Sequence, residues 1–422
     1  MRVTPPPTVV ALGLGLAAAL VFGEGLARLA AWWSPAVRDL AVPRDARPTR
    51  AFNSLEAYLA SQPTQIVPHR NWFNYWNNAL GFNDEEFDVP KPTGRFRIMA
   101  VGDSSTFGLV PYPDSVMTLL EARLRAVCRG RDLDVLNFGI GGTGVDDYRA
   151  IVTLGFATYA PDLVVVHFYA GNDGPDVYRL AHERSQWHAL LGYSRLWTFA
   201  RNAIRLHRHV PEAVRAAGNR PAQPDPGGPA PRGGAVVDPG HPLRQDDLAL
   251  VGPIFDAEAF DSILGQELRR LYVPPDPAML ERAWQPVIGA LDAIRDRVSR
   301  GQARLALVVY PSVLQVDATV REQLVRRLHE RGSYVPLTLA AVDPELPQKR
   351  LAAYCRRVGL PCFDLTPAFV RAHHDAPSPA LYKQRDAHWT RLGNAVAAEA
   401  EAGHLEPLVC SAVGRVSRRE GS

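Results

Sequence analysis

Cysteine is scarce in this sequence. Its 422 residues include only four cysteines, and none lies in a Cys-x-x-Cys pair or in a Cys/His spacing typical of zinc sites. A structural zinc site is therefore not expected. Two of the cysteines, Cys355 and Cys362, flank a predicted helix end and the strand that follows it. A disulfide would fit them in an oxidising compartment, and so would two small buried side chains.

An excess of charge of one sign is also missing. The formal net charge is only +3, and no block of lysine and arginine or basic stretch interleaved with aromatic residues is present. Nucleic acid is therefore not an expected partner, because it is bound through clustered positive charge. With 46% hydrophobic and 22% charged residues, the chain has the composition of a folded globular protein.

The N-terminus contains a long apolar stretch. No charge occurs from Val9 to Gly23, and the apolar character resumes after Glu24 and Arg28 as far as Trp33. This length is enough to span a bilayer, and Glu24 and Arg28 can pair on one face of a helix. Residues 1–36 are therefore predicted to form an uncleaved membrane anchor.

Two questions about this anchor stay open at the level of sequence. A cleaved signal peptide is the rival interpretation, although no persuasive small-x-small cleavage site precedes the tryptophans at the end of the stretch. The orientation is the second question, because four arginines follow the stretch within residues 38–50. The positive-inside rule alone would place the C-terminal body in the cytoplasm.

The rest of the chain divides into a linker with an N-terminal extension, 37–94, and a domain, 95–412. In this domain short runs rich in Val, Ile, Leu and Phe alternate with amphipathic segments; the runs are 96–102, 134–140, 163–171, 303–312 and 359–367. Buried strands that alternate with helices are typical of a parallel sheet covered on both faces. The sequence therefore predicts an α/β domain.

A large insertion is predicted at about 176–278, between the third and fourth strands. It is about three times longer than a crossover between parallel strands requires. It begins with a predicted helix, 194–210, and continues into residues 218–242, half of which are proline or glycine. Such a composition buries little apolar surface and predicts a flexible loop.

Residues able to perform chemistry follow the predicted strands. Ser104 follows the first, a glycine-rich turn with Gly142 follows the second, and Asn172 follows the third, while Asp386 and His388 lie in a late loop. Acyl transfer by a serine requires a base, a group that orients the base, and donors for the oxyanion. His388 and Asp386 can meet the first two needs. Gly142, Asn172 and the Ser104 amide can supply the donors.

In block order, these motifs resemble those of the SGNH (GDSL-type) hydrolases. The resemblance rests on "GDS" at 102–104, "NFGIGG" at 137–142, "GND" at 171–173 and the Asp386/His388 pair. It implies a three-layer α/β/α fold with a flavodoxin-like parallel sheet, with Ser104 as the nucleophile. It also implies an oxyanion hole of Gly142, Asn172 and the Ser104 amide, and no cofactor.

The spacing of the last pair differs from the commonest family form, Asp-x-x-His. The shorter Asp-x-His-Trp spacing is familiar from membrane-anchored bacterial members and from related polysaccharide O-acetyltransferases. The resemblance therefore implies a membrane-anchored subgroup, an extracytoplasmic catalytic domain, and an acyl-ester or acylated carbohydrate substrate. A membrane-bound acyltransferase partner is a further expectation.

Several alternatives accompany this interpretation. Ser105 competes with Ser104 as the nucleophile, with capping of the following helix as its plainer role. His373 and His374 are interpreted as a solvated loop rather than as metal ligands, because adjacent side chains point to different sides. The candidate functions are an esterase, an O-acetyltransferase, and a catalytically silent glycan-binding or assembly protein.

Overall fold

The computed structural model describes residues 7–34, 52–60, 71–72, 75–182, 194, 196, 199, 255–334, 337–375 and 381–411. The chain divides into two compact units, Met1–Pro48 with His182–Pro229, and Thr49–Ala181 with Ala230–Ser422. The first unit contains helix α1, Pro7–Trp33, in which Glu24 and Arg28 form the expected pair at 2.8 Å. Glu24 also accepts hydrogen bonds from the Ser194 hydroxyl and the Leu196 amide of the same unit.

Helix α1 covers the segment expected to anchor the chain. Within the described residues, no helix has the length and apolar character needed to cross a membrane. The anchor therefore remains a prediction from the sequence.

A parallel sheet of five strands forms the centre of the second unit. The strands are β3 (Phe96–Gly102), β4 (Leu133–Gly139), β5 (Leu163–Tyr169), β6 (Arg304–Tyr310) and β7 (Cys362–Asp364). They lie in the order β4-β3-β5-β6-β7, and every neighbouring pair is parallel. The predicted α/β fold is thus confirmed. This strand order is the flavodoxin-like one, in which the direction of the crossovers reverses between β3 and β5.

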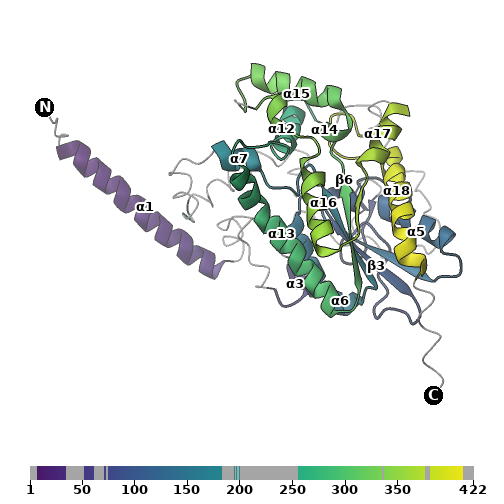
Figure 1. Ribbon diagram of the computed structural model, residues 1–422. Helices are drawn as coiled ribbons and strands as arrows, with labels where there is room; N and C mark the ends of the chain where they lie inside the picture. Colours follow the sequence, from purple (N-terminus) through teal and green to yellow (C-terminus); the bar gives the residue numbers. More distant parts are fainter. Residues whose placement is uncertain are drawn as a thin grey trace. The chain divides into compact units, whose positions relative to one another are not determined.

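Helices cover both faces of this sheet, as Figure 1 shows. Alternate side chains of β3 enter different cores: Ile98 and Ala100 lie on one face, Met99 and Val101 on the other. The first face is covered by α5 (Val116–Val127), α12 (Ala257–Leu268), α14 (Val313–Val316), α15 (Ala318–Glu330), α17 (Thr366–Asp375) and α18 (Arg391–Cys410). The second is covered by α3 (Leu55–Ala60), α6 (Val145–Tyr159), α13 (Pro277–Arg300) and α16 (Leu346–Val358). Strands buried on both faces explain why the apolar runs are nearly continuous.

The segment before β3 packs against the sheet domain. It contains the short antiparallel strands β1 (Asn71–Trp72) and β2 (Tyr75–Trp76). The side chain of the buried Asn83 donates hydrogen bonds to the carbonyl oxygens of Phe107 and Gly108, which lie in the segment that follows β3. Asp84 accepts the amide of Asn137 in β4 at 2.8 Å. This extension therefore supports the loop that follows β3.

Apart from residues 194, 196 and 199, only the two ends of the predicted insertion are among the described residues. Helix α7 (Val177–His182) and helix α12 form these ends. The Pro/Gly-rich loop at 218–242 and most of the predicted helix at 194–210 lie outside the described residues.

All four cysteines are paired. Cys355 and Cys362 form a disulfide between α16 and β7, which is the disulfide alternative from the sequence. Cys128 and Cys410 form a second one, although they are 282 residues apart in the sequence. This second pair joins the ends of α5 and α18, and spacing in the sequence carries no signal for it.

The buried pair of Arg97 and Asp134 joins β3 to β4 and provides a test of the fold. The Arg97 side chain is fully buried, and its Nη2 lies 2.8 Å from Asp134 Oδ2. We expect Asp134→Ala to lower the free energy of unfolding by about 3–5 kcal/mol, because the guanidinium would stay buried without its partner. Urea denaturation measures this change. The control Arg282→Ala removes an exposed pair and should cost about 1 kcal/mol or less; an equal loss in both variants would contradict the prediction.

Candidate active site

The candidate site lies at the carboxyl edge of the sheet, beside β3. Gly102 at the end of β3 is level with Gly139 at the end of β4, so the loops after these strands begin side by side. The short helix α4 (Ser104–Phe107) packs directly over this edge. A Cβ on Gly139 would collide with the backbone of Phe107, so glycine is required there for the close approach. Ligands of such sheets bind at this edge, near the point where the crossovers reverse.

Ser104, His388 and Asp386 form a continuous chain of hydrogen bonds. His388 Nε2 lies 2.8 Å from Ser104 Oγ, and His388 Nδ1 lies 2.7 Å from Asp386 Oδ1. The His388 side chain is 29% exposed, whereas that of Asp386 is 9% exposed. The structure thus brings together the three residues predicted as nucleophile, base and orienting group. Ser104 is half-buried, and the carboxylate at the other end of this series of hydrogen bonds is buried.

The short Asp-x-His spacing is accommodated by a local turn. Asp386 Oδ1 accepts the backbone N–H of His388 as well as its ring nitrogen. A carboxylate that accepts the amide two residues later is typical of an Asx-turn. An antiparallel bridge between Tyr382 and Trp389 closes the loop, and Thr390 caps α18 directly after it. Asp386 therefore reaches the imidazole without the additional residue of the longer spacing.

The environment sets the charge of this pair. Burial raises the pKa of Asp386, but the charge of His388 and the hydrogen bond to it lower that pKa more, so the net pKa lies below 3.8. Burial lowers the pKa of His388, but the Asp386 carboxylate raises it more, so the net pKa lies above 6.5. Asp386 is thus a carboxylate at neutral pH, positioned to stabilise an imidazolium.

Asp103 connects the loops after β3 and β5. Its side chain is buried and accepts the Ser105 amide at 2.8 Å, which makes Asp103 the N-cap of α4. Its other oxygen accepts Nδ2 of Asn172 at 2.7 Å. The amide group of Asn172 carries a second N–H, which can be donated to a substrate oxygen. Burial raises the pKa of Asp103, against the hydrogen bonds from Ser105 and Asn172.

The glycine-rich loop after β4 lies beside the serine. A Cβ built on Gly141 would lie 3.8 Å from the Cβ of Ser104. Gly142 has φ +72°, in the left-handed region that glycine adopts without strain. This loop can therefore present backbone N–H groups near Ser104, which is the arrangement expected of an oxyanion donor.

The structure distinguishes Ser104 from Ser105. Ser104 lies against His388, while the Ser105 side chain is buried and its amide donates to Asp103. The predicted capping role of Ser105 is wrong, because the carboxylate of Asp103 caps α4 instead.

The structure also shows the surroundings of Trp389 and of the two adjacent histidines. Trp389 is buried and packs against Tyr310 and Phe369 as a core residue. His373 and His374 lie in the last turn of helix α17, so the predicted loop at these residues is wrong, although the side chain of His374 is exposed as predicted.

Helix α12 and the residues just after it contribute two side chains near the candidate site that the sequence motifs did not indicate. Arg270, just after α12, donates from Nε to the backbone oxygen of Asn172 at 3.0 Å. Glu267 accepts hydroxyl hydrogen bonds from Tyr169, the last residue of β5, and from Ser312, which follows β6. Burial raises the pKa of Glu267 to about 7. No sequence motif marks these residues, because they belong to the end of the insertion and contact the site only in three dimensions.

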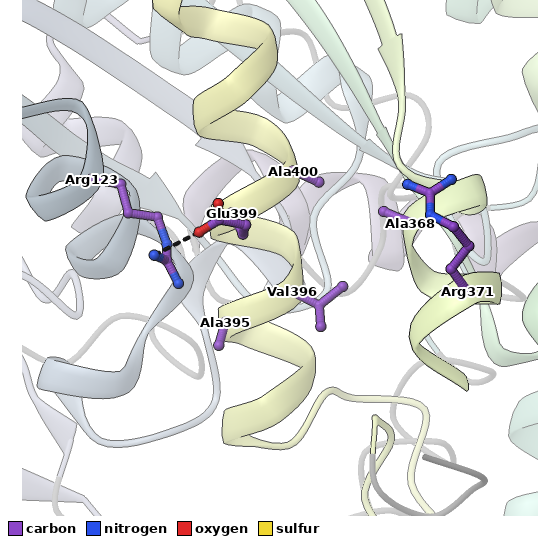
Figure 2. A pocket seen from close by; sticks show the side chains of 7 residues that line it. All are labelled: Arg123, Ala368, Arg371, Ala395, Val396, Glu399 and Ala400. Atoms are coloured by element: carbon purple, nitrogen blue, oxygen red, sulfur yellow. Dashed lines mark ion pairs between the residues drawn. The ribbon is translucent and has the colours of Figure 1, made fainter. Parts of the chain in front are cut away.

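A surface hollow of about 380 Å³ lies elsewhere, between α5, α17 and α18 (Figure 2). An ion pair between Arg123 and Glu399, 2.7 Å apart, lies on one side of it. The residues that line the hollow are Arg123, Ala368, Arg371, Ala395, Val396, Glu399 and Ala400. None of them belongs to the predicted site, so the hollow is not where the proposed chemistry would occur.

Fold and site together define an α/β protein with a hydrogen-bonded serine, histidine and aspartate at the sheet edge. Several solved structures resemble it at low sequence identity and low TM-score. One is an acetylxylan esterase from Geobacillus stearothermophilus, at 12% identity and a TM-score of 0.36, over 74% of this chain and 94% of that one. Another is a lipolytic protein of the G-D-S-L family from Desulfitobacterium hafniense DCB-2, at 11% identity and a TM-score of 0.32, over 73% of this chain and 99% of that one.

A two-domain esterase active on acetylated mannans is also similar, at 11% identity and a TM-score of 0.33, over 74% of this chain and 49% of that one. No protein-family model and no curated protein sequence matches the chain. At these TM-scores the similarity says nothing about the activity of this chain.

The contact between Asp386 and His388 predicts a change in the pKa of His388 that can be measured when Asp386 is replaced. We expect Asp386→Asn to lower the pKa of His388, because the charge that favours the imidazolium is removed. NMR titration of the His388 ring measures it. The control Asp375→Asn changes an exposed pair with His374 and should leave the pKa of His388 where it is. A pKa unchanged in Asp386→Asn would contradict the observed geometry.

Stability should follow the same linkage. The pKa of His388 is raised in the folded state, so its stabilising contribution is present below 6.5 and is lost as the pH rises through the raised pKa. The pKa of Asp386 is lowered in the folded state, so its stabilising contribution is present above 3.8 and is lost as the pH falls through the lowered pKa. The loss of stability in Asp386→Asn should therefore be largest at pH values between 3.8 and 6.5.

Proposed function

We propose that this protein is a serine-dependent acyl-ester hydrolase that acts through an acyl-enzyme. The observation that carries the proposal is the unbroken chain from Ser104 Oγ through the His388 ring to Asp386, at 2.8 and 2.7 Å. Hydroxyl, imidazole and carboxylate in this order are the groups that activate a serine for attack on a carbonyl. Ser104 is half-buried rather than fully buried, which supports access of a substrate to it.

In the proposed mechanism Ser104 Oγ attacks the ester carbonyl while His388 Nε2 takes its proton. Asp386 stabilises the imidazolium, because the lowered pKa of Asp386 keeps its side chain ionised. The N–H groups of Gly142, Asn172 and Ser104 would donate to the oxyanion, and donors of this kind are worth about 10²–10³ in rate each. The imidazolium then protonates the leaving alkoxide. Water, activated by the neutral imidazole, finally releases the acid and Ser104.

We propose acylated glycans or other cell-envelope esters as the substrates, as the sequence resemblance suggests. A sugar hydroxyl can replace water in the last step, which would make the protein an O-acetyltransferase working beside a membrane-bound acetyl donor. The Asp386-x-His388-Trp389 spacing favours this second function, because it occurs in related O-acetyltransferases.

We also propose that the catalytic domain lies outside the cytoplasm. The two disulfides support this location, because disulfides form and persist in oxidising compartments. An N-terminal membrane anchor would be consistent with it.

Replacement of the serine is the first test. In the full-length protein we expect Ser104→Ala to lower kcat/KM for a chromogenic acetyl ester by about 10³-fold or more, because no other group can form the acyl-enzyme. Ser105→Ala is the matched control and should lose less than about tenfold, since its side chain does not contact His388. Equal activity of Ser104→Ala and the parent would refute the proposed function.

The acyl acceptor is identified in the same assay. Acetyl transfer to an added oligosaccharide that exceeds hydrolysis would favour the O-acetyltransferase. An intact protein with neither ester cleavage nor a covalent adduct on Ser104 would favour the silent binding protein.

The proposed location predicts the state of the thiols. A maleimide reagent is added to the full-length protein during cell lysis. It should react with none of the four cysteines before reduction and with all four after reduction. A mass shift on a denaturing gel measures this. Four reactive thiols without reduction would contradict an oxidising location.

A further inference from the structure

A lysine lies buried beside the predicted histidine and aspartate. Lys383 belongs to the loop 381–390 that carries both residues, and it is only 8% exposed. A buried ammonium group is costly unless it is hydrogen-bonded or balanced by opposite charge. The position of Lys383 therefore calls for a physical reason.

The side chain of Lys383 joins the two loops of the site. Its Nζ donates to the backbone oxygen of Leu109. Leu109 directly follows Gly108, the C-cap of the helix that begins with Ser104. The contact therefore holds the loop that carries His388 to the segment that carries Ser104.

The backbone of Lys383 also shapes the turn. Its N–H donates to the oxygen of His388 at 2.9 Å, and its own oxygen accepts the N–H of Asp386. Arg385, between them, has φ +51°, as a tight turn requires. Lys383 and His388 are neighbours across the turn, next to the bridge between Tyr382 and Trp389.

The charge of Lys383 opposes the negative charges that face His388. Asp386 in the same loop and Asp103 after β3 raise the pKa of His388, whereas Lys383 lowers it. Glu267 of α12 also interacts electrostatically with His388. Lys383 also lowers the pKa of Asp386. One cation thus favours both the carboxylate and the neutral imidazole, the forms that proton abstraction needs.

We propose that Lys383 is a positioning residue for the acyl-transfer reaction: it holds the loop of His388 against the segment of Ser104, and its charge opposes protonation of the imidazole. The inference rests on the proposed function and adds a residue to it. Lys383 touches no reacting atom, so its effect is exerted through His388 and Asp386.

The test compares Lys383→Met with Lys383→Arg in the full-length protein. Loss of the contact to Leu109 should lower kcat by about 10²-fold with KM nearly unchanged, because a displacement of about 1 Å is enough for such a loss. The acid limb of the kcat/KM profile should move to higher pH, since the imidazolium becomes easier to form. Lys383→Arg keeps the charge and should keep the position of that limb.

Controls separate this role from a general loss of structure. Lys349→Met removes an exposed lysine paired with Asp343 and should change neither kcat nor the acid limb. Should Lys383→Met fail to fold, Lys383→Gln serves as the uncharged variant that keeps an N–H donor. A folded, uncharged variant with the parent's kcat and acid limb would overturn the proposal.

NMR titration of His388 distinguishes this failure from that of the proposed function. Its pKa should rise in the uncharged variants and remain in place in Lys383→Arg. If the pKa does not move, only the role of Lys383 fails. If the parent protein neither cleaves esters nor labels Ser104 with a fluorophosphonate probe, the proposed function and this role fail together.

Discussion

The parallel alignment of the five strands is the constraint on which the rest of the structure depends. Because neighbouring strands run in the same direction and in register, the loops after β3, β4 and β5 all begin at one edge. Segments separated by dozens of residues therefore meet there. The continuous apolar strands make this alignment stable, since each face of the sheet packs against its own layer of helices.

Two carboxylates then determine the detailed geometry at that edge. Asp103 caps α4 and binds the amide of Asn172, so one buried side chain fixes both the turn of the serine and the third loop. Asp386 performs the same double task in its own loop, where it accepts both the amide and the ring nitrogen of His388. In each case a local turn and a contact within the site depend on the same carboxylate, so the site is built into the fold of its loops.

The end of the insertion also takes part in this edge. Arg270 holds the backbone of Asn172, and Glu267 joins the ends of β5 and β6 through two hydroxyl groups. The insertion interrupts the alternation of strands and helices, yet its last helix returns to the sheet. Glycine at 171 permits this approach, because a Cβ there would collide with Glu267 and Tyr169.

The sequence by itself determined the alternation of strands and helices, because burial on both faces leaves continuous apolar runs that are visible without a structure. It also indicated Ser104, since residues after such runs share one edge, and it indicated Asp386 and His388 through the chemistry that a serine nucleophile requires and through the motif resemblance. Only the tertiary structure decided that Ser104 rather than Ser105 faces the imidazole, that Asp103 binds Asn172, and that Cys128 pairs with Cys410. The contacts of Glu267 and Lys383 were likewise decided only by the tertiary structure. These features depend on distances between segments far apart in the chain, and no local pattern encodes such distances.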